Sequence, residues 1–291
     1  MTLLDARSLA ALGDLSLVAR RVVDGFMFGV HPSRLQGAGL EFSQYRSYQP
    51  GDDLRRLDWR LFARSDRYFV RESESETSVT VRIVLDASDS MRHEEDGVSK
   101  LAFGRMLAAA LALLAFRQGD ALSLVTLGRG GASGGRPDRG RQHYHRVLRE
   151  LEQLEPGGVW PPWPSLEGPL LGGAGRGITI LISDLHERSD EIRAVVRKLA
   201  ALRHDTLVAH LVGRAELEFA FAGAMTFEEL ETVRTVAVDA GAARDGYLAS
   251  YGRELRTLEL ELGEQRAGYA RILLDQPLDT ALRSALTARR G

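Results

Sequence analysis

The hydrophobic pattern of the chain changes character at about residue 79. Downstream of this point, short apolar runs alternate with longer segments in which apolar residues recur at helical spacing. The apolar runs cover residues 79–85, 121–127, 178–183 and 206–212, and the helical segments cover 99–117, 145–154 and 190–203. Apolar runs without polar alternation are typical of strands buried on both faces of a parallel sheet. We therefore predict an α/β fold, doubly wound, with a mostly parallel sheet and helices on both faces.

The segments on either side of this alternating series predict two additions. Upstream, one helical segment and two extended stretches are expected, at residues 3–28, 40–48 and 67–75. Downstream, we expect paired strands, a helix, a strand and a last helix, at residues 215–238, 247–266, 269–274 and 278–289. Two stretches rich in glycine or proline, residues 128–141 and 156–177, predict loops. The chain is divided into an N-terminal extension, residues 1–78, and an α/β domain with a C-terminal elaboration, residues 79–291.

Composition narrows the class of protein. The chain has 291 residues, of which 44% are hydrophobic and 27% charged, with a net charge of −2, so its overall charge favours neither nucleic acid nor an anionic membrane as a partner. The chain has no cysteine, which excludes disulfides, zinc–thiolate sites and cysteine nucleophiles. The longest uncharged apolar stretch, residues 106–116, is too short to span a bilayer, and charges interrupt residues 1–29, unlike a signal peptide. We expect a cytoplasmic protein without a membrane span.

The sharpest local signal is the loop Asp86-Ala87-Ser88-Asp89-Ser90, which directly follows the first apolar strand. Ligands of open α/β sheets bind at this carboxyl edge. Asp184 ends another apolar strand, so we expect the two strands to be parallel neighbours and both carboxylates to lie beside solvent at one edge. Carboxylate and hydroxyl oxygens suit Mg²⁺, Mn²⁺ or Ca²⁺. The candidate metal ligands are therefore Asp86, Ser88, Ser90 and Asp184, and the alternative is that the loop only caps the next helix.

This arrangement resembles the metal-ion-dependent adhesion site (MIDAS) of von Willebrand factor A domains. The resemblance implies a bound Mg²⁺ and a third loop that supplies a threonine. The corresponding loop here lies within residues 156–167 and reads PGGVWPPWPSLE, with Val159 at the place of the threonine and Ser165 as its only hydroxyl. The metal site is therefore incomplete by the family pattern, and Asp89 is the candidate to compensate.

A second dense run lies upstream, from Pro50-Gly51-Asp52-Asp53 to Asp58-Trp59. It is similar to the signature of the bacterial domain-of-unknown-function family 58, in which it precedes a von Willebrand factor A-like domain. The resemblance extends over almost the whole chain and implies a partnership with a MoxR-type AAA+ ATPase. The run is interpreted as structural: a Pro-Gly turn, carboxylates that cap a short helix expected at residues 54–62, and a packed Trp59. In the alternative, Arg55, Asp58 and Arg64 present a charged surface to a partner.

These observations favour a protein-binding adaptor over an enzyme. The expected role is chaperone-like: binding a client protein, with the help of a metal ion if the MIDAS-like site holds one, and working with a MoxR-type ATPase in assembly or maturation. One alternative is a metal-dependent hydrolase that uses Asp86 and Asp184, although no convincing general base lies near these loops. Another is a structural module with a degenerate metal site.

The structural interpretation of the upstream run can be tested at Trp59. An indole in a short capped helix has a large apolar area to bury, so Trp59→Ala is expected to lower the free energy of unfolding by about 3–5 kcal/mol. Thermal and urea denaturation of the purified variant measure the loss. An unchanged melting temperature would favour the surface role instead.

Overall fold

The structure is a computed structural model that describes residues 5–28, 44–47, 69–72, 79–171, 177–186, 191–201, 205–228 and 235–288. The chain forms two compact units. Residues 5–28 and those from 79 onward form the larger unit, and two short strands belong to the smaller one. The two strands, β1 (Gln44–Ser47) and β2 (Phe69–Glu72), form an antiparallel pair. Trp59, Arg55, Asp58 and Arg64 lie outside the described residues, so the expectations for them stay predictions.

A six-stranded sheet forms the centre of the larger unit, in the order β12-β9-β8-β3-β6-β7. Its strands are β3 (Thr80–Asp86), β6 (Ala121–Gly128), β7 (Gly131–Gly134), β8 (Gly177–Ser183), β9 (Asp205–Val212) and β12 (Gly268–Leu273). All are parallel to their neighbours except β7, which runs antiparallel to β6. Because β3 pairs directly with β8, the expectation that the strands ending near Asp86 and Asp184 are parallel neighbours is confirmed.

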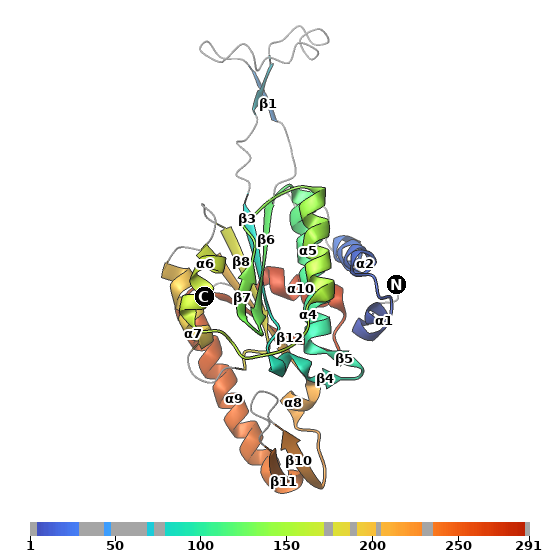
Figure 1. Cartoon of the computed structure of the whole chain (residues 1–291), viewed down its shortest axis with the longest axis vertical. Helices are drawn as coiled ribbons and strands as arrows, with labels where there is room; N and C mark the ends of the chain where they lie inside the picture. The colour runs from blue at the N-terminus through green and yellow to red at the C-terminus, as the bar shows by residue number, and fades with distance from the viewer. Residues whose placement is uncertain are drawn as a thin grey trace. The chain divides into compact units, whose positions relative to one another are not determined.

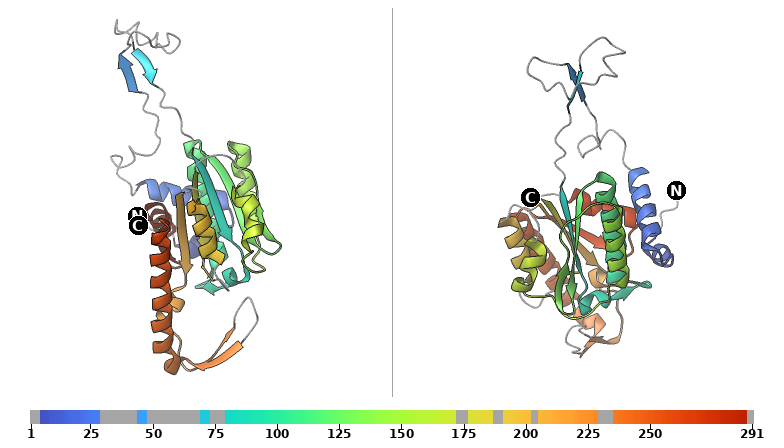
Figure 2. Two further views of the ribbon diagram at one scale, coloured as in Figure 1. Left: turned by 90° about the vertical axis from the view of Figure 1, so that its left-hand side faces the viewer. Right: turned by 45° about the horizontal axis from the view of Figure 1, so that its top comes forward.

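Helices cover both faces of this sheet, which makes three layers (Figures 1 and 2). One hydrophobic cluster joins the sheet to α1 (Ala6–Ala10), α2 (Leu15–Phe28), α4 (Lys100–Gln118), α5 (Arg141–Gln153) and α10 (Leu278–Thr287). The second joins the opposite face to α6 (Trp163–Leu171), α7 (Glu191–Ala201) and α9 (Ala240–Glu264). Alternate residues of β3 enter different clusters: Ile83 and Leu85 the first, Val84 the second. Burial on both faces explains why the strands read as continuous apolar runs, and the predicted doubly wound α/β fold is confirmed.

The central helix α4 is the longest apolar helix among the described residues. By length and composition alone it could cross a membrane, but about 67% of its apolar window is buried inside the protein. It lies against the sheet on one side and against α2, α5 and α10 on others. Gly104 lets it approach closely, since a Cβ there would lie 2.9 Å from the Leu85 Cδ1. Its apolar composition is therefore explained by its place in the core.

The N-terminal helices belong to the larger unit. The sequence analysis treated residues 1–78 as one extension, whereas α2 packs on α4 and α10. Val18, Ala19, Val22 and Val23 form the buried face of α2. The structure thus divides the extension into a helical part that completes the core and a second part that contains β1 and β2.

Two predicted loops contain regular elements. The glycine-rich stretch 128–141 includes β7, which pairs with β6 after a turn at Arg129 and Gly130. Gly130 and Gly131 both have positive φ. The proline-rich stretch 156–177 includes α6. Neither element has a periodic apolar pattern in its sequence. Each is stabilised by the strand or helix that it contacts. The remaining short elements are the 3-10 helix η3 (Asp89–Arg92), the hairpin β4 (Glu94–Glu95) with β5 (Val98–Ser99), helix α8 (Arg214–Glu218), and the hairpin β10 (Ala224–Glu228) with β11 (Thr235–Asp239).

The close approach of α4 to the sheet predicts a large difference between two glycine variants. Gly104→Val places two further methyl groups against Leu85 and is expected to lower the free energy of unfolding by about 1–3 kcal/mol through overpacking. Gly246→Val is the matched control, since Gly246 is an exposed residue of α9 with nothing within 4 Å of a Cβ. The control should unfold within about 0.5 kcal/mol of the wild type in urea. Equal stabilities for the two variants would contradict the packing described here.

Candidate functional site

The candidate site lies where the sheet changes its winding direction. The chain passes from β3 to β6 on one side and later returns to β8 on the other side of β3. The helices that follow these strands, α4 and α7, pack on opposite faces of the sheet. Open α/β sheets bind their ligands at the carboxyl ends of the strands where the winding reverses. Asp86 is the last residue of β3, and Asp184 directly follows β8. Both therefore lie at the edge where ligands of such sheets bind.

Asp86 is fully buried, with 0% of its surface exposed. Its Oδ1 accepts a hydrogen bond from the Ser88 N–H at 2.8 Å, and its Oδ2 accepts one from the Ser183 Oγ at 2.6 Å. Burial, followed by the charge of Asp184, raises the pKa of Asp86 to about 7. The expectation that this carboxylate lies beside solvent is wrong. The loop at residue 157 lies beside the residue that follows Asp86, because the Gly157 N–H donates to the Ala87 carbonyl at 2.7 Å.

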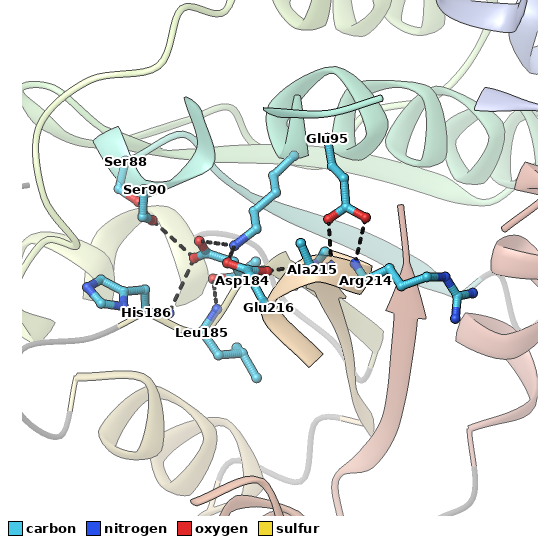
Figure 3. Close-up of polar contacts among 12 residues, drawn as sticks. Ser88, Ser90, Glu95, Asp184, Leu185, His186, Arg214, Ala215 and Glu216 are labelled. Atoms are coloured by element: carbon cyan, nitrogen blue, oxygen red, sulfur yellow. Dashed lines mark hydrogen bonds and ion pairs between the residues drawn. The ribbon is translucent and has the colours of Figure 1, made fainter. Parts of the chain in front are cut away.

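The other predicted site residues continue the same network. The Ser88 and Ser90 hydroxyls lie 3.0 Å apart, and the Ser90 Oγ donates to the Asp184 Oδ1 at 3.1 Å (Figure 3). Asp184 is 8% exposed, so it too is buried instead of facing solvent. The structure therefore brings together all four residues that the sequence identified: Asp86, Ser88, Ser90 and Asp184.

Two charged residues of this cluster were missed by the sequence analysis. Lys100, at the start of α4, places its Nζ 3.1 Å from the Asp184 Oδ2 and 2.7 Å from the Glu216 Oε1. Burial opposes the charge of Lys100, but Asp184 and Glu216 outweigh it and raise the lysine pKa. Burial likewise opposes the charge of Asp184, but the Lys100 ammonium and the His186 N–H hold the pKa of Asp184 below its usual value. No spacing rule joins residues 100, 184 and 216, so only the folded chain reveals this triad.

The position of Glu216 is fixed by the start of α8. Its Oε2 accepts a hydrogen bond from the Gly213 N–H at 2.7 Å. Glu95, on the β4–β5 hairpin, accepts from the N–H groups of Arg214 and Ala215 (Figure 3). The two carboxylates accept hydrogen bonds from N–H groups that the first turn of a helix leaves unpaired. Their negative charge is also favourable beside the positive end of the helix dipole. The backbone at the start of α8 is fixed by these hydrogen bonds, and from there the Glu216 carboxylate contacts the Lys100 ammonium.

The third loop packs against the Asp86–Ser90 loop, as the resemblance implied, but through its backbone. The Asp89 N–H donates to the Gly158 carbonyl, and the Gly158 N–H donates to the Asp89 Oδ2, both at 2.9 Å. The Asp89 Oδ1 accepts from the Arg92 Nε at 2.7 Å. Asp89 is therefore bonded to the loop and to Arg92, which argues against it as a compensating ligand. Val159 is 38% exposed, and Ser165 lies on the exposed side of α6.

These residues do not fit a divalent cation bound in the expected way. Mg²⁺ takes about six oxygen ligands in near-octahedral geometry. Both oxygens of Asp86 and both oxygens of Asp184 already accept hydrogen bonds from the protein. The Lys100 ammonium, bonded to Asp184, repels a second cation at the same carboxylate. Val159 supplies no side-chain oxygen. Within the described residues, no group of three or more His, Asp and Glu side chains is arranged to hold a metal. The expected Mg²⁺ stays a prediction that this geometry does not favour.

The nearby histidines do not add a catalytic base. His210, on β9, is fully buried, and burial lowers its pKa to about 4, so it is neutral. Its Nδ1 lies 2.8 Å from the Tyr269 hydroxyl. His186 is exposed and contributes its backbone N–H to the Asp184 Oδ1 at 3.2 Å. The buried carboxylates contact protein donors, an arrangement that does not favour the hydrolase alternative.

Comparison with known proteins identifies the family. Residues 44–256 match the family described as "Protein of unknown function DUF58". The chain belongs to this family. Uncharacterized proteins of Mycobacterium bovis and Mycobacterium tuberculosis are 30% identical to it over 249 residues, which cover 84% of this chain and 77% of theirs. The sequence resemblance to domain-of-unknown-function family 58 is thereby confirmed.

Solved structures with similar folds have low sequence identity. An aerotolerance-related membrane protein from Bacteroides fragilis has a TM-score of 0.46 at 17% identity, covering 72% of this chain and 98% of that one. The conserved hypothetical protein BatB from Bacteroides thetaiotaomicron has a TM-score of 0.44 at 14% identity, with the same coverage. The SpRpn10 VWA domain has a TM-score of 0.43 at 10% identity, covering 74% of this chain and 98% of that one.

The hydrogen bond from Ser183 to Asp86 predicts a stability cost. Ser183→Ala removes the donor to a buried carboxylate, so we expect the free energy of unfolding to fall by about 1–3 kcal/mol. Ser165→Ala is the matched control, because Ser165 is exposed on α6 and its substitution should change stability by less than about 0.5 kcal/mol. Chemical denaturation of both variants checks the difference. Loss of stability in the control alone would contradict the network.

Proposed function

We propose that this DUF58 protein is a cytoplasmic protein-binding adaptor without catalytic activity of its own. It works with a MoxR-type AAA+ ATPase and binds a client protein during the assembly or maturation of other proteins. One observation carries the proposal. The charged groups at the carboxyl edge of the sheet are buried and bonded to one another, while the residues around them are exposed. Such an edge presents a fixed surface to a partner instead of a reactive group to a substrate.

The proposed contact surface is the carboxyl-edge rim, defined as Arg92, Arg129, Val159 and His186. Each extends from a loop that is held by the buried network. Arg92 bonds to Asp89 and to the carbonyl of the third loop at Pro156, Arg129 follows β6 beside Gly158, and Val159 follows Gly158. Arginine is enriched in protein interfaces and among their hot spots. The loops are fixed before binding, so little conformational entropy would be lost there.

The choice of a MoxR-type ATPase as partner rests on family membership. The chain has no P-loop motif G-x-x-x-x-G-K-[ST], so a process that needs ATP requires a separate protein. An adaptor function also agrees with the site, where the described residues supply neither an exposed nucleophile with an adjacent base nor an arranged set of metal ligands. A metal-assisted mode of partner binding is the variant of this proposal that a chelator tests.

The rim is tested by partner capture with variants that place a glutamate on it. The immobilised chain is incubated with the purified MoxR-type ATPase of the same organism, with and without EDTA. Arg129→Glu and Val159→Glu are expected to weaken capture at least about tenfold, the loss typical of an interface hot spot. Arg141→Glu, an exposed substitution at the opposite edge of the sheet, is the matched control and should capture as the wild type does.

Two results would contradict this proposal. One is equal capture by the rim variants and the control. The other is turnover of phosphatase or esterase substrates by the purified wild type that Asp86→Asn abolishes. Loss of capture in EDTA would favour the metal-assisted variant, and indifference to EDTA would favour direct contact through the rim.

A further inference from the structure

The lysine content of the chain is unusual. Of its 38 lysine and arginine residues, two are lysines, Lys100 and Lys198. Lys198 is exposed on α7, where its Nζ lies 5.7 Å from the centre of the Trp163 ring. Lys100 is 4% exposed. A chain that otherwise uses arginine therefore places one of its two ammonium groups in the buried cluster. An ammonium is compact and resembles a small cation, whereas a guanidinium is planar and larger.

The contacts of Lys100 connect it to the candidate metal ligands. Its Nζ and the Ser90 hydroxyl bind opposite oxygens of Asp184, each at 3.1 Å. Ser90 in turn contacts Ser88 at 3.0 Å. Asp184 thus receives the ammonium on one side and the hydroxyl of the Asp86–Ser90 loop on the other. The ammonium is one carboxylate away from the place where the expected metal ion would be held.

The local charges require a cation at this place. Asp86 and Asp184 are buried carboxyl groups, and Glu216 beside them is partly exposed. Isolated buried carboxylates are strongly disfavoured. Lys100 is the ammonium that contacts Asp184 and Glu216. The third loop offers Val159, whose side chain cannot bind a metal, at the position that the metal-binding pattern gives to a threonine. The cluster therefore has a protein cation and lacks a ligand that a metal ion would use.

We propose that the Lys100 ammonium is a built-in cation that replaces the divalent metal ion at this edge. Its role is to position Asp184, Glu216 and the loops attached to them. The site is complete without a metal, and the wild type does not require Mg²⁺, Mn²⁺ or Ca²⁺ to hold its carboxyl edge. This inference concerns the purified chain alone, so its test is independent of any partner.

The first test is metal titration of the wild type. Millimolar Mg²⁺, Mn²⁺, Ca²⁺ or EDTA is expected to leave its melting temperature unchanged, and calorimetry should show no saturable binding. Saturable binding of any of the three ions at millimolar concentration, or a lower melting temperature in EDTA, would overturn the proposal.

The second test replaces the ammonium. Lys100→Ala leaves space beside Asp184 and Glu216, and its melting temperature should fall. Ethylammonium chloride or Mn²⁺ should restore part of the loss, and calorimetry should show saturable Mn²⁺ binding at millimolar concentration, which the wild type lacks. Lys198→Ala is the matched control, and it should gain neither the stabilisation nor the binding. A folded Lys100→Ala that neither cation stabilises would overturn the proposal.

A double variant covers the case in which Lys100→Ala does not fold. Asp184→Asn removes the charge that the lysine balances, so Lys100→Ala with Asp184→Asn should be more stable than Lys100→Ala alone and should lack the gain in Mn²⁺ binding. Refolding of Lys100→Ala by either cation, or recovery of the fold in the double variant, supports the proposal. An unfolded single variant that neither change improves contradicts it.

Discussion

A buried ammonium between two carboxylates organises the carboxyl edge of this sheet. Removing the charges of Lys100 and Asp184 from water costs several kcal/mol per ion, so each is stable only while its partners remain in place. Lys100 begins α4, Asp184 follows β8, and Glu216 lies on α8 after β9. One set of contacts thus joins three crossover connections that are distant in the sequence. Breaking the Lys100–Asp184 pair leaves an uncompensated buried charge, so we expect the elements that carry these residues to unfold together.

The position of Lys100 opposes its own helix. A cation at the N-terminus of a helix faces the positive end of the helix dipole, which is unfavourable. The Ser99 hydroxyl caps the helix by accepting a hydrogen bond from the Ala102 N–H at 3.1 Å. The ammonium therefore gains no favourable interaction from the helix end. The acidic partners must therefore compensate for both burial and the dipole. Close packing of α4 on the sheet at Gly104 keeps Lys100 within contact distance of Asp184 and Glu216.

The surface of the edge follows from this buried arrangement. Both carboxylate oxygens of Asp86 and of Asp184 accept hydrogen bonds from protein donors. The backbone of the third loop bonds to Ala87 and Asp89 of the neighbouring loop. What remains exposed is a rim of arginine, valine and histidine side chains on fixed loops. A metal-dependent surface would gain its charge from an ion, whereas the proposed surface would carry its charge in its own residues. If Lys100 replaces the metal ion as proposed, the D-x-S-x-S loop of this chain is not sufficient to infer a metal ion, and the residue at position 100 must be considered with it.

The sequence by itself determined the layers of the fold and the place of the site. Parallel strands that are buried on both faces do not alternate between apolar and polar residues, so continuous apolar runs identify them. Aspartates at the ends of two such runs lie close together if the strands are neighbours. The tertiary structure decided what the sequence left open. Lys100 and Glu216 join the cluster through contacts spanning 84 and 116 residues, for which no local pattern exists. Strand β7 and helix α6 lie in stretches rich in glycine and proline, where packing and pairing override weak local preferences. Whether the aspartates face solvent or protein depended on donors from several parts of the chain: Ser183 for Asp86, and Ser90 and Lys100 for Asp184.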